Sequence, residues 1–286
     1  MPELPEVETV VKGLRPKMEN CTFSRVEQRR KNLRIPFPRD FVERLENSTI
    51  TSLWRRAKYI LAELDSGEVL LMHLGMSGRF TIDETPPEQS GASPGRHDHV
   101  IFHMNNGAVI TYTDPRRFGL MTLIDATRFH NHRLLKNIGI EPLGNELSGT
   151  FLAQCFAGKK TSLKAALLDQ KNIAGLGNIY VCEALYRSCL SPLRRAATLA
   201  RPGARAVERA DGLAIAIRNV LSDAIAAGGS SLKDYVRTNG ELGYFQHRFD
   251  VYDREGEECR RKTCSGRIKR IVQSGRSSFY CPRCQR

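Results

Sequence analysis

The sequence predicts an α+β protein in three parts: a β-rich N-terminal domain opened by a helix, a mainly helical domain, and a C-terminal zinc hairpin. Turn signals between short apolar runs recur through residues 22–125, which is typical of antiparallel sheets. An apolar stripe of helical period covers residues 204–226, and two cysteine pairs with zinc-ligand spacing follow residue 250. We place the three domains at residues 1–130, 131–249 and 250–286.

Composition indicates a polyanionic partner. The 286 residues include 44 Lys and Arg against 31 Asp and Glu, a net charge of +13. Because no amphipathic basic helix stands out, this excess favours nucleic acid over a membrane surface, although solvated faces alone explain many basic proteins. No run reaches the roughly 18 apolar residues of a membrane span, and the acidic start is unlike a signal peptide. We therefore expect a cytoplasmic protein without membrane association.

The first residues combine a helix with a reactive amine. Pro5 suits a first helical turn, and an apolar stripe of spacing i, i+3, i+4, i+7 follows it. Removal of Met1 would leave Pro2 as a secondary amine, and α-amino groups have a pKa of about 7.7–8.0. Its adduct with an aldehyde carbon is an iminium without an N–H to lose, and Glu3 can shuttle protons beside it. The alternative is an ordinary helix whose acidic residues suit the helix dipole.

The rest of the first domain is predicted to be β-structure. Asp65-Ser66-Gly67 and Asn105-Asn106-Gly107 each separate two apolar runs, which indicates two hairpins. Strands at this spacing favour a β-sandwich or a flattened barrel. The Pro-, Gly- and Ser-rich segment 83–96 reads as a surface loop. The expected strands are 22–28, 49–55, 58–64, 68–72, 99–104 and 108–113.

Helical patterns replace this alternation beyond residue 126. The longest expected helix ends at Gly228-Gly229, because successive glycines favour a helix C-terminus. Ala174 to Tyr180 reads as a tight turn that opens a helix with Asn178 as its cap, and such a terminus binds phosphate or simply joins two helices. Lys159, Lys160 and Lys164 either reach the same phosphates or form a solvated face. The expected helices are 151–156, 162–168, 179–187 and 204–226.

Four C-terminal cysteines have the spacing of a zinc site. Cys259-x4-Cys264 and Cys281-x2-Cys284 are separated by 16 residues, and four thiolates would leave zinc no open position for catalysis. We therefore expect one structural zinc ion; unpaired core cysteines are the alternative. A basic hairpin between the pairs suits a nucleic-acid backbone. The remaining cysteines read as small apolar residues in a reducing compartment.

Two further turns carry large side chains. His73 to Gly78 includes Met76, and Asp114 to Gly119 includes Arg116 and Phe118. Such side chains suit insertion between stacked bases, or else core packing. Lys58 opens a strand after two arginines, and the alternative for it is a surface cation.

Together these motifs resemble one family over essentially the whole chain. They are the Pro-Glu-Leu-Pro-Glu-Val-Glu start, Ala-Lys58-Tyr, His-Leu-Gly-Met-Ser-Gly, Asp-Pro-Arg-Arg-Phe-Gly, Gly-Leu-Gly-Asn-Ile-Tyr and Gly-Arg276-Ser-Ser-Phe-Tyr-Cys-Pro-Arg-Cys-Gln. The chain closely resembles the bacterial formamidopyrimidine-DNA glycosylases, which excise 8-oxoguanine and ring-opened purines and nick the strand by β,δ-elimination. The resemblance implies a monomer with a β-sandwich, a helix–two-turn–helix domain and a zinc β-hairpin, and damaged double-stranded DNA in the cleft between the halves.

The resemblance also implies roles for individual residues. Pro2 would attack C1′ of the damaged nucleotide, Glu3 would transfer protons at the sugar, and Lys58 would assist through adjacent phosphates and in elimination. Arg276 would grip a phosphate beside the lesion, and residues 229–243 would begin a loop over the flipped base. Met76, Arg116 and Phe118 would fill the gap, with Arg116 facing the orphaned cytosine, and the expected DNA or base contacts are His97, Lys159, Lys164 and Asn178.

One departure and two alternatives remain. The first cysteine pair has four intervening residues where the commoner family form has two, which affects local hairpin geometry and not metal binding. A related branch removes oxidised pyrimidines, but Leu4 and the His-Leu-Gly-Met-Ser-Gly turn favour the purine branch. A non-catalytic zinc-ribbon protein would explain the charge and the cysteines, but not the combination of Pro2, Glu3 and Lys58.

Overall fold

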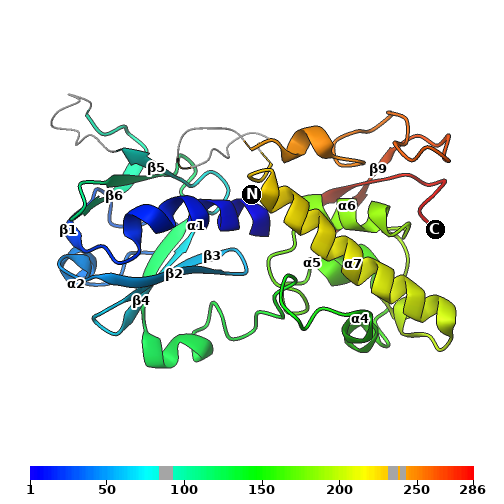
Figure 1. Cartoon of the computed structure of the whole chain (residues 1–286), viewed down its shortest axis with the longest axis horizontal. Coiled ribbons are helices and arrows are strands. Elements are labelled where there is room, and N and C mark those ends of the chain that lie inside the picture. The colour runs from blue at the N-terminus through cyan, green and yellow to red at the C-terminus, as the bar shows by residue number, and fades with distance from the viewer. Residues whose placement is uncertain (84–92, 231–237, 239–242) are drawn as a thin grey trace. The chain divides into compact units, whose positions relative to one another are not determined.

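The computed structural model describes residues 1–83, 93–230, 238 and 243–286. The chain divides into two compact units, shown in Figure 1: unit 1 is residues 1–136 with 227–244, and unit 2 is residues 137–226 with 245–286. The predicted boundaries near residues 130 and 249 stay a prediction. In the described part of the chain, no helix has both the length and the apolar character that a membrane crossing requires.

Unit 1 begins with helix α1, Leu4–Met18, which has a proline in its first turn as predicted. The stripe Val7, Val10, Val11 and Leu14 is buried, so the helix packs against the core and does not fray. Figure 1 shows α1 lying along the strands of the same unit, where it contacts β2, Ile50–Arg56.

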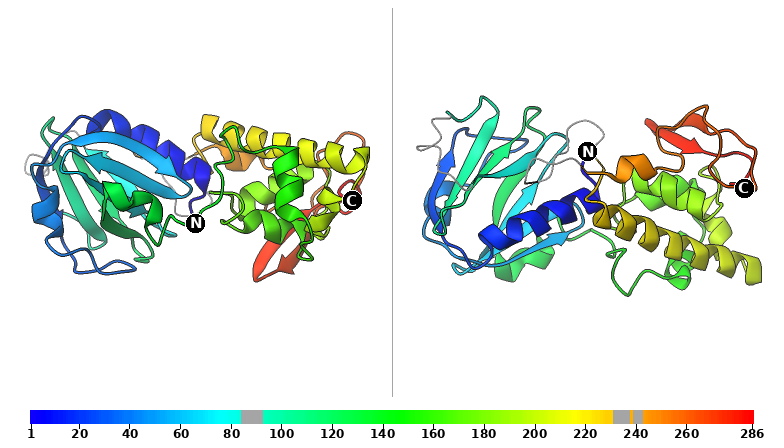
Figure 2. Two further views of the ribbon diagram at one scale, coloured as in Figure 1. Left: turned by 90° about the horizontal axis from the view of Figure 1, so that it is seen from below. Right: turned by 45° about the horizontal axis from the view of Figure 1, so that its top comes forward.

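Two four-stranded antiparallel sheets form the body of unit 1 (Figure 2). Apolar side chains of both sheets, such as Phe102 and Met72, belong to one buried core together with the stripe of α1. The structure is therefore the β-sandwich, not the flattened barrel. One sheet has the order β1 (Phe23–Gln28), β6 (Asp98–Met104), β7 (Val109–Thr113), β5 (Arg79–Asp83), and the other β2, β3 (Tyr59–Leu64), β4 (Glu68–His73), β8 (Leu120–Asp125).

Both predicted hairpins are present. Gly67 and Gly107 have φ of 81° and 84°, the left-handed conformation that glycine adopts without strain. The six predicted strands are confirmed, whereas β5, β8 and the short helix α2, Phe41–Leu45, were not singled out in the sequence. The 3₁₀ helix η1, Ala126–Asn131, follows β8. Most of the predicted loop at 83–96 lies outside the described residues.

Unit 2 is helical and carries the C-terminal hairpin (Figure 1). Ser148 and Ser162 cap two of its helices by accepting hydrogen bonds from backbone N–H groups. The longest helix has the predicted bounds, and Gly228 and Gly229 follow it with φ of 75° and 80°. The elements are α4 (Gly149–Phe156), α5 (Leu163–Leu168), α6 (Asn178–Arg187), η2 (Ala196–Ala200), α7 (Ala204–Ala226), η3 (Phe245–Arg248), β9 (Lys269–Gln273) and β10 (Arg276–Tyr280).

The predicted cap of α6 is wrong. Gly177, with extended φ and ψ, is the N-cap, and Asn178 is the first helical residue. The Asn178 side chain turns away from its own helix and donates to the Ser277 carbonyl at 2.9 Å. A tertiary contact that the local sequence does not contain has therefore taken the amide from its expected role.

Candidate active site

The N-terminal turn is buried and fixed by two carboxylates. Pro2, Glu3 and Glu6 are buried, whereas Met1 is 51% exposed. The Glu3 N–H donates to Glu6 Oε2 at 2.8 Å within a capping box. Glu6 Oε1 also accepts from the backbone N–H and the hydroxyl of Ser230, at 2.9 and 3.0 Å. The N-terminal turn is thus held in place, and the sequence did not reveal this role of Glu6.

Lys58 stands in a strained two-residue turn between β2 and β3. Ala57 has a φ of 54°, uncommon for any residue with a Cβ, and Lys58 is only 7% exposed. Arg55 donates to the Ala57 carbonyl at 3.0 Å and pairs with Glu8 of α1 at 2.9 Å. The chain Glu8–Arg55–Ala57 therefore ties the Lys58 turn to the helix that bears Pro2 and Glu3. Burial excludes the surface-cation alternative for Lys58.

His73 is a site residue that sequence reasoning missed. Burial, with the nearby cations Lys58 and Arg34, lowers the pKa of His73 to about 4. The Gly75 N–H donates to His73 Nδ1 at 3.0 Å, so the neutral ring carries its proton on Nε2. A neutral donor therefore stands beside the Lys58 turn. The signal in the sequence was its position at the strand end just before the glycine turn.

Asp114 joins the two turns that carry large side chains. Its carboxylate is fully buried and accepts from Ser77 Oγ at 2.6 Å, Tyr112 OH at 3.3 Å and the Gly119 N–H at 2.9 Å. Burial and Asp114 raise the pKa of Tyr112, which keeps its hydroxyl a donor. Ser77 Oγ in turn accepts from the Arg116 N–H at 3.1 Å. The two turns consequently form one rigid unit.

The tips of these turns reach solvent. Phe118 is 46% exposed, which excludes core packing for this residue, and the Arg116 guanidinium lies 4.9 Å from its ring centroid. Met76 is half-buried. His97 is exposed next to a basic hollow of about 370 Å³ whose cationic lining is Arg29, Arg30, Lys31 and Arg96.

In unit 2, two predicted contact residues converge on the hairpin. Ser274 and Gly275 both have positive φ, the geometry of a tight two-residue turn, and exposed Arg276 follows directly. Lys164 Nζ donates to the Ser277 carbonyl at 2.9 Å and contacts Ser278 Oγ at 2.6 Å. Asn178 donates to the same carbonyl.

The three lysines of this region differ in exposure. Lys164 is 1% exposed, so the solvated-face alternative is wrong for it. Lys159 is half-buried; its Nζ donates to Asn172 Oδ1 at 2.8 Å and lies over the Phe156 ring. Lys160 is exposed. Contacts of these lysines with DNA stay a prediction.

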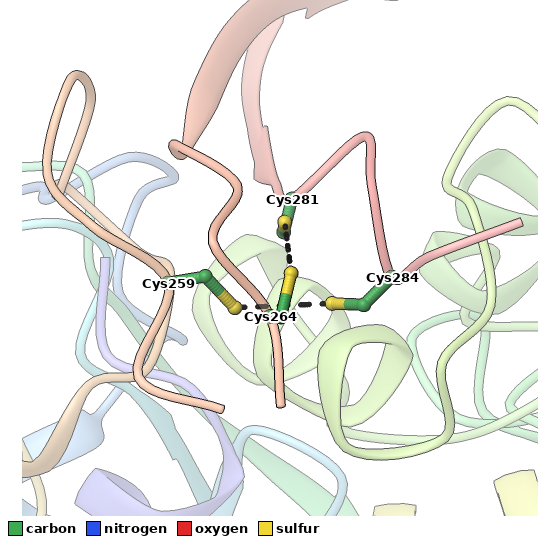
Figure 3. Close-up of side chains that lie close together, drawn as sticks. All are labelled: Cys259, Cys264, Cys281 and Cys284. Carbon is green, nitrogen blue, oxygen red and sulfur yellow. Dashed lines mark hydrogen bonds between the residues drawn. The ribbon is translucent and has the colours of Figure 1, made fainter. Parts of the chain in front are cut away.

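The four C-terminal cysteines form a metal site (Figure 3). Cys259 Sγ lies 3.8 Å from Cys284 Sγ, and Cys264 Sγ lies 3.7 Å from Cys281 Sγ. Tetrahedral Zn–S bonds of about 2.3 Å place sulfurs about 3.8 Å apart. The thiolate set thus fits zinc, and the longer first cysteine pair does not disturb it. Four ligands make the zinc structural.

Contacts from α6 hold this site. The Tyr186 hydroxyl lies 3.3 Å from Cys259 Sγ, and Arg261 donates to the Tyr186 carbonyl at 3.0 Å. Buried Glu183 accepts three backbone N–H groups of residues 250–252, at 2.8–3.0 Å. The segment that leads to the cysteines is therefore anchored to the helix that begins at Asn178.

Family models match all three parts of the chain. The formamidopyrimidine-DNA glycosylase N-terminal domain matches residues 1–121, and the H2TH domain of the same enzymes matches residues 138–236. The chain belongs to the formamidopyrimidine-DNA glycosylase family. A zinc finger found in these glycosylases and in isoleucyl-tRNA synthetases matches residues 256–286.

Similar proteins agree with this assignment. Formamidopyrimidine-DNA glycosylases of Beijerinckia indica and Bradyrhizobium sp. strain ORS 278 are 58% and 57% identical, with full coverage of both chains in each case. The MutM (Fpg) crystal structure from Thermus thermophilus has a TM-score of 0.83 at 36% identity, covering 99% of this chain and 98% of that one. A Lactococcus lactis Fpg complex with abasic-site DNA has a TM-score of 0.84 at 30% identity and 99% coverage of both.

Membership fixes the class of activity. The chain is a base-excision DNA-repair glycosylase with AP-lyase activity and one structural zinc. Unit 1 brings the Pro2–Glu3 turn and the Lys58 turn together through α1, and Met76, Arg116 and Phe118 together through Asp114. Unit 2 brings together Lys164, Asn178 and the backbone next to Arg276.

Proposed function

We propose that this glycosylase excises oxidised purines, namely 8-oxoguanine and formamidopyrimidines, from double-stranded DNA, and then nicks the strand by β,δ-elimination. It acts as a monomer in the cytoplasm. The observation that carries the proposal is the buried Pro2–Glu3 turn, in which Glu6 fixes the backbone next to the nucleophile.

Pro2 is the nucleophile once Met1 has been removed. Its ring nitrogen bonds to C1′ of the damaged nucleotide, the bond from C1′ to the base breaks, and the base leaves with the electron pair and a proton. Glu3 protonates the sugar ring oxygen, and the opened sugar becomes an iminium. The iminium acidifies C2′, so loss of that proton expels the 3′ phosphate, and a second elimination expels the 5′ phosphate. Lys58 assists through the adjacent phosphates and in elimination.

The remaining site residues hold the DNA. Met76, Arg116 and Phe118 fill the space of the extruded base, with Arg116 toward the orphaned cytosine; their tethering through Asp114 and the exposure of Phe118 support this role. Arg276 binds a phosphate beside the lesion. His97, Lys159, Lys164 and Asn178 contact the DNA or the base. The predicted loop over the flipped base lies mostly outside the described residues.

Solved relatives support the substrate class. Lactococcus lactis Fpg variants about 29–30% identical to this chain were crystallised with DNA containing Fapy-dG. The wild-type enzyme of the same organism was also crystallised with DNA containing an oxidised pyrimidine. Oxidised pyrimidines are therefore the second candidate substrate.

Borohydride trapping tests the proposal. Enzyme mixed with a duplex carrying 8-oxoguanine opposite cytosine should form a covalent complex when the imine is reduced, and an oxidised pyrimidine should give much less. One extra glycine before Pro2 keeps the ring nitrogen in an amide, so that variant should trap nothing. Pro5→Ala, which alters a neighbouring proline that carries no chemistry, should trap like the wild type.

Two other outcomes would select an alternative. Preferential trapping with the oxidised pyrimidine would make pyrimidines the substrate. If no lesion traps the wild-type protein, and an abasic site also fails, the protein binds DNA without this chemistry.

A further inference from the structure

A second strongly basic hollow lies in unit 2. It has a volume of about 250 Å³ and lies between the end of η2 and the start of α7. Figures 1 and 2 both show the first turn of α7 apart from the hairpin that carries β9 and β10. We name this hollow the arginine pocket, after the four arginines that line it: Arg194, Arg201, Arg205 and Arg209.

Local structure brings these arginines together. Arg205 and Arg209 are four residues apart on α7 and therefore share one face. Pro202 and Gly203, which has a φ of 116°, turn the chain so that Arg201 lies at the same opening. The Ala206 N–H donates to the Gly203 carbonyl at 3.1 Å where α7 opens, and the first turn of this helix contains no acidic residue that would offset the arginines.

The cluster has no acidic side chain as a partner in the described part of the chain. None of the four guanidinium groups forms an ion pair with an Asp or Glu side chain. Arg194 Nε donates to the main-chain oxygen of Arg286 at 3.1 Å. Burial, together with nearby Arg209 and Arg201, lowers the pKa of Arg194. Like charges that crowd at a partly buried position destabilise the fold unless an anion neutralises them.

The pocket is continuous with a segment that carries predicted DNA contacts. The Ala197 N–H donates to the Lys159 carbonyl at 3.1 Å, and the Ala196 N–H donates to the Thr161 carbonyl at 3.0 Å. Ala196 and Ala197, which follow Arg194 by two and three positions, thus pair directly with the backbone next to Lys160. The Leu163 N–H likewise donates to the Arg194 carbonyl at 2.6 Å, so an arginine that lines the pocket is a backbone neighbour of the residue before Lys164.

We propose that the arginine pocket is a second phosphate-binding site, which holds a backbone phosphate of the duplex flanking the lesion. Guanidinium groups suit this ligand because they bind phosphate oxygens in a bidentate manner. The inference rests on the proposed function for the presence of DNA, but it concerns neither the lesion nor the chemistry. A free phosphorylated compound is the other source of the same ligand.

Duplex length and salt separate these sources. Binding of the full chain is measured by fluorescence anisotropy on two duplexes that contain the same uncleavable abasic-site analogue. The shorter duplex extends about five base pairs to each side of the lesion and the longer one about fifteen, and the slope of log K against log salt counts the phosphates that are neutralised. The variant is Arg201→Gln with Arg205→Gln, which leaves Arg194 and its bond to the Arg286 carbonyl intact.

On the longer duplex the variant should flatten the salt slope by about one to two units and weaken binding about tenfold. On the shorter duplex it should match the wild type. The control Arg128→Gln with Arg133→Gln removes the same charge from exposed positions in unit 1 and should leave the length dependence unchanged. Arg201→Lys with Arg205→Lys should restore most of the slope, which excludes a folding defect as the cause.

Titration with inorganic phosphate at constant ionic strength is the second arm. If phosphate binds the wild type but not the glutamine variant, while both have equal slopes on the longer duplex, the flanking-duplex proposal is overturned in favour of a free phosphorylated ligand. If the glutamine variant equals the control in both arms, there is no phosphate site. Borohydride trapping on a duplex of the shorter length that carries 8-oxoguanine in place of the analogue is independent of either result, so it reports failure of the proposed function separately.

Discussion

Two β-turns each present a cation, and they do so by opposite means. Lys58 in unit 1 follows an alanine with positive φ and is 7% exposed, and its turn is tied to α1 by the part-buried ion pair of Arg55 with Glu8. Arg276 in unit 2 follows a Ser-Gly turn, is exposed, and depends on four cysteines and two side-chain contacts behind it. The comparison teaches that Lys58, the proposed catalytic cation, is almost buried in a turn held by side-chain contacts, whereas Arg276, the proposed phosphate-binding cation, is exposed on a hairpin held by a metal site.

Zinc removal should produce the largest difference between the two turns. Cys284→Ser removes one thiolate, and because structural zinc contributes on the order of 10 kcal/mol to small sites, β9 and β10 should lose their order. Hydrogen exchange should show rapid exchange at residues 269–280 and unchanged protection in the sandwich. Cys21→Ser, which alters a cysteine outside the cluster, should change neither region. Equal loss of protection in both units would refute the claim that the metal orders the hairpin and not the sandwich.

Neutralising Glu8 should have the next largest effect. Glu8→Gln removes the carboxylate charge that faces the Arg55 side chain, which is 8% exposed, and this destabilises by about 2 kcal/mol. Urea unfolding should show this loss, and covalent trapping should slow because the Lys58 turn loses its tether. Asp223→Asn breaks the ion pair of Arg187 at a half-exposed position and should change stability by at most about 0.5 kcal/mol. An equal effect of both variants would contradict the role assigned to the buried pair.

Acid sensitivity separates the two turns further. His73 has a pKa of about 4 in the folded chain against 6.5 for an unperturbed histidine, so the unfolded chain binds more protons between these values. Stability should therefore fall as pH drops from 6.5 to 4, by up to about 1.4 kcal/mol per unit. His73→Gln should remove this contribution, while exposed His247→Gln in unit 2 should not. Parallel curves of stability against pH for the wild type and His73→Gln would disprove the contribution of His73 to acid sensitivity.

Backbone strain predicts the smallest effect. Ala57 and Ser274 both have positive φ, at 54° and 50°. A left-handed residue with a Cβ costs about 1 kcal/mol, which the flexibility of glycine in the unfolded chain partly offsets. Ala57→Gly and Ser274→Gly should each stabilise the protein by about 0.5 kcal/mol in thermal unfolding, but only Ala57→Gly should slow trapping. Destabilisation by Ala57→Gly would show that the packing contacts of the alanine methyl group contribute more to stability than the relief of backbone strain.

Local signals predicted much of the fold. The apolar stripe of α1, the two glycine turns of the sandwich, the bounds of α7 and the zinc ligands all follow from spacing within a few residues. Contacts between distant residues could not be predicted. Glu8 and Arg55 are 47 residues apart, and Asn178 and Ser277 are 99 apart. For this reason we predicted Asn178 to be a helix cap, and the sequence did not reveal the ion pair that joins the Lys58 turn to α1.

One bond also constrains the order in which the molecule can be built. Glu6 accepts from Ser230, 224 positions later, and unit 1 takes residues 227–244 from beyond the helical insertion. During synthesis the sandwich can form its strands early, but the contacts that hold Pro2, the proposed nucleophile, stay incomplete until about four-fifths of the polypeptide has left the ribosome. A nascent chain arrested before residue 227 should therefore be unable to trap an abasic site, so that a half-made enzyme does not attack DNA.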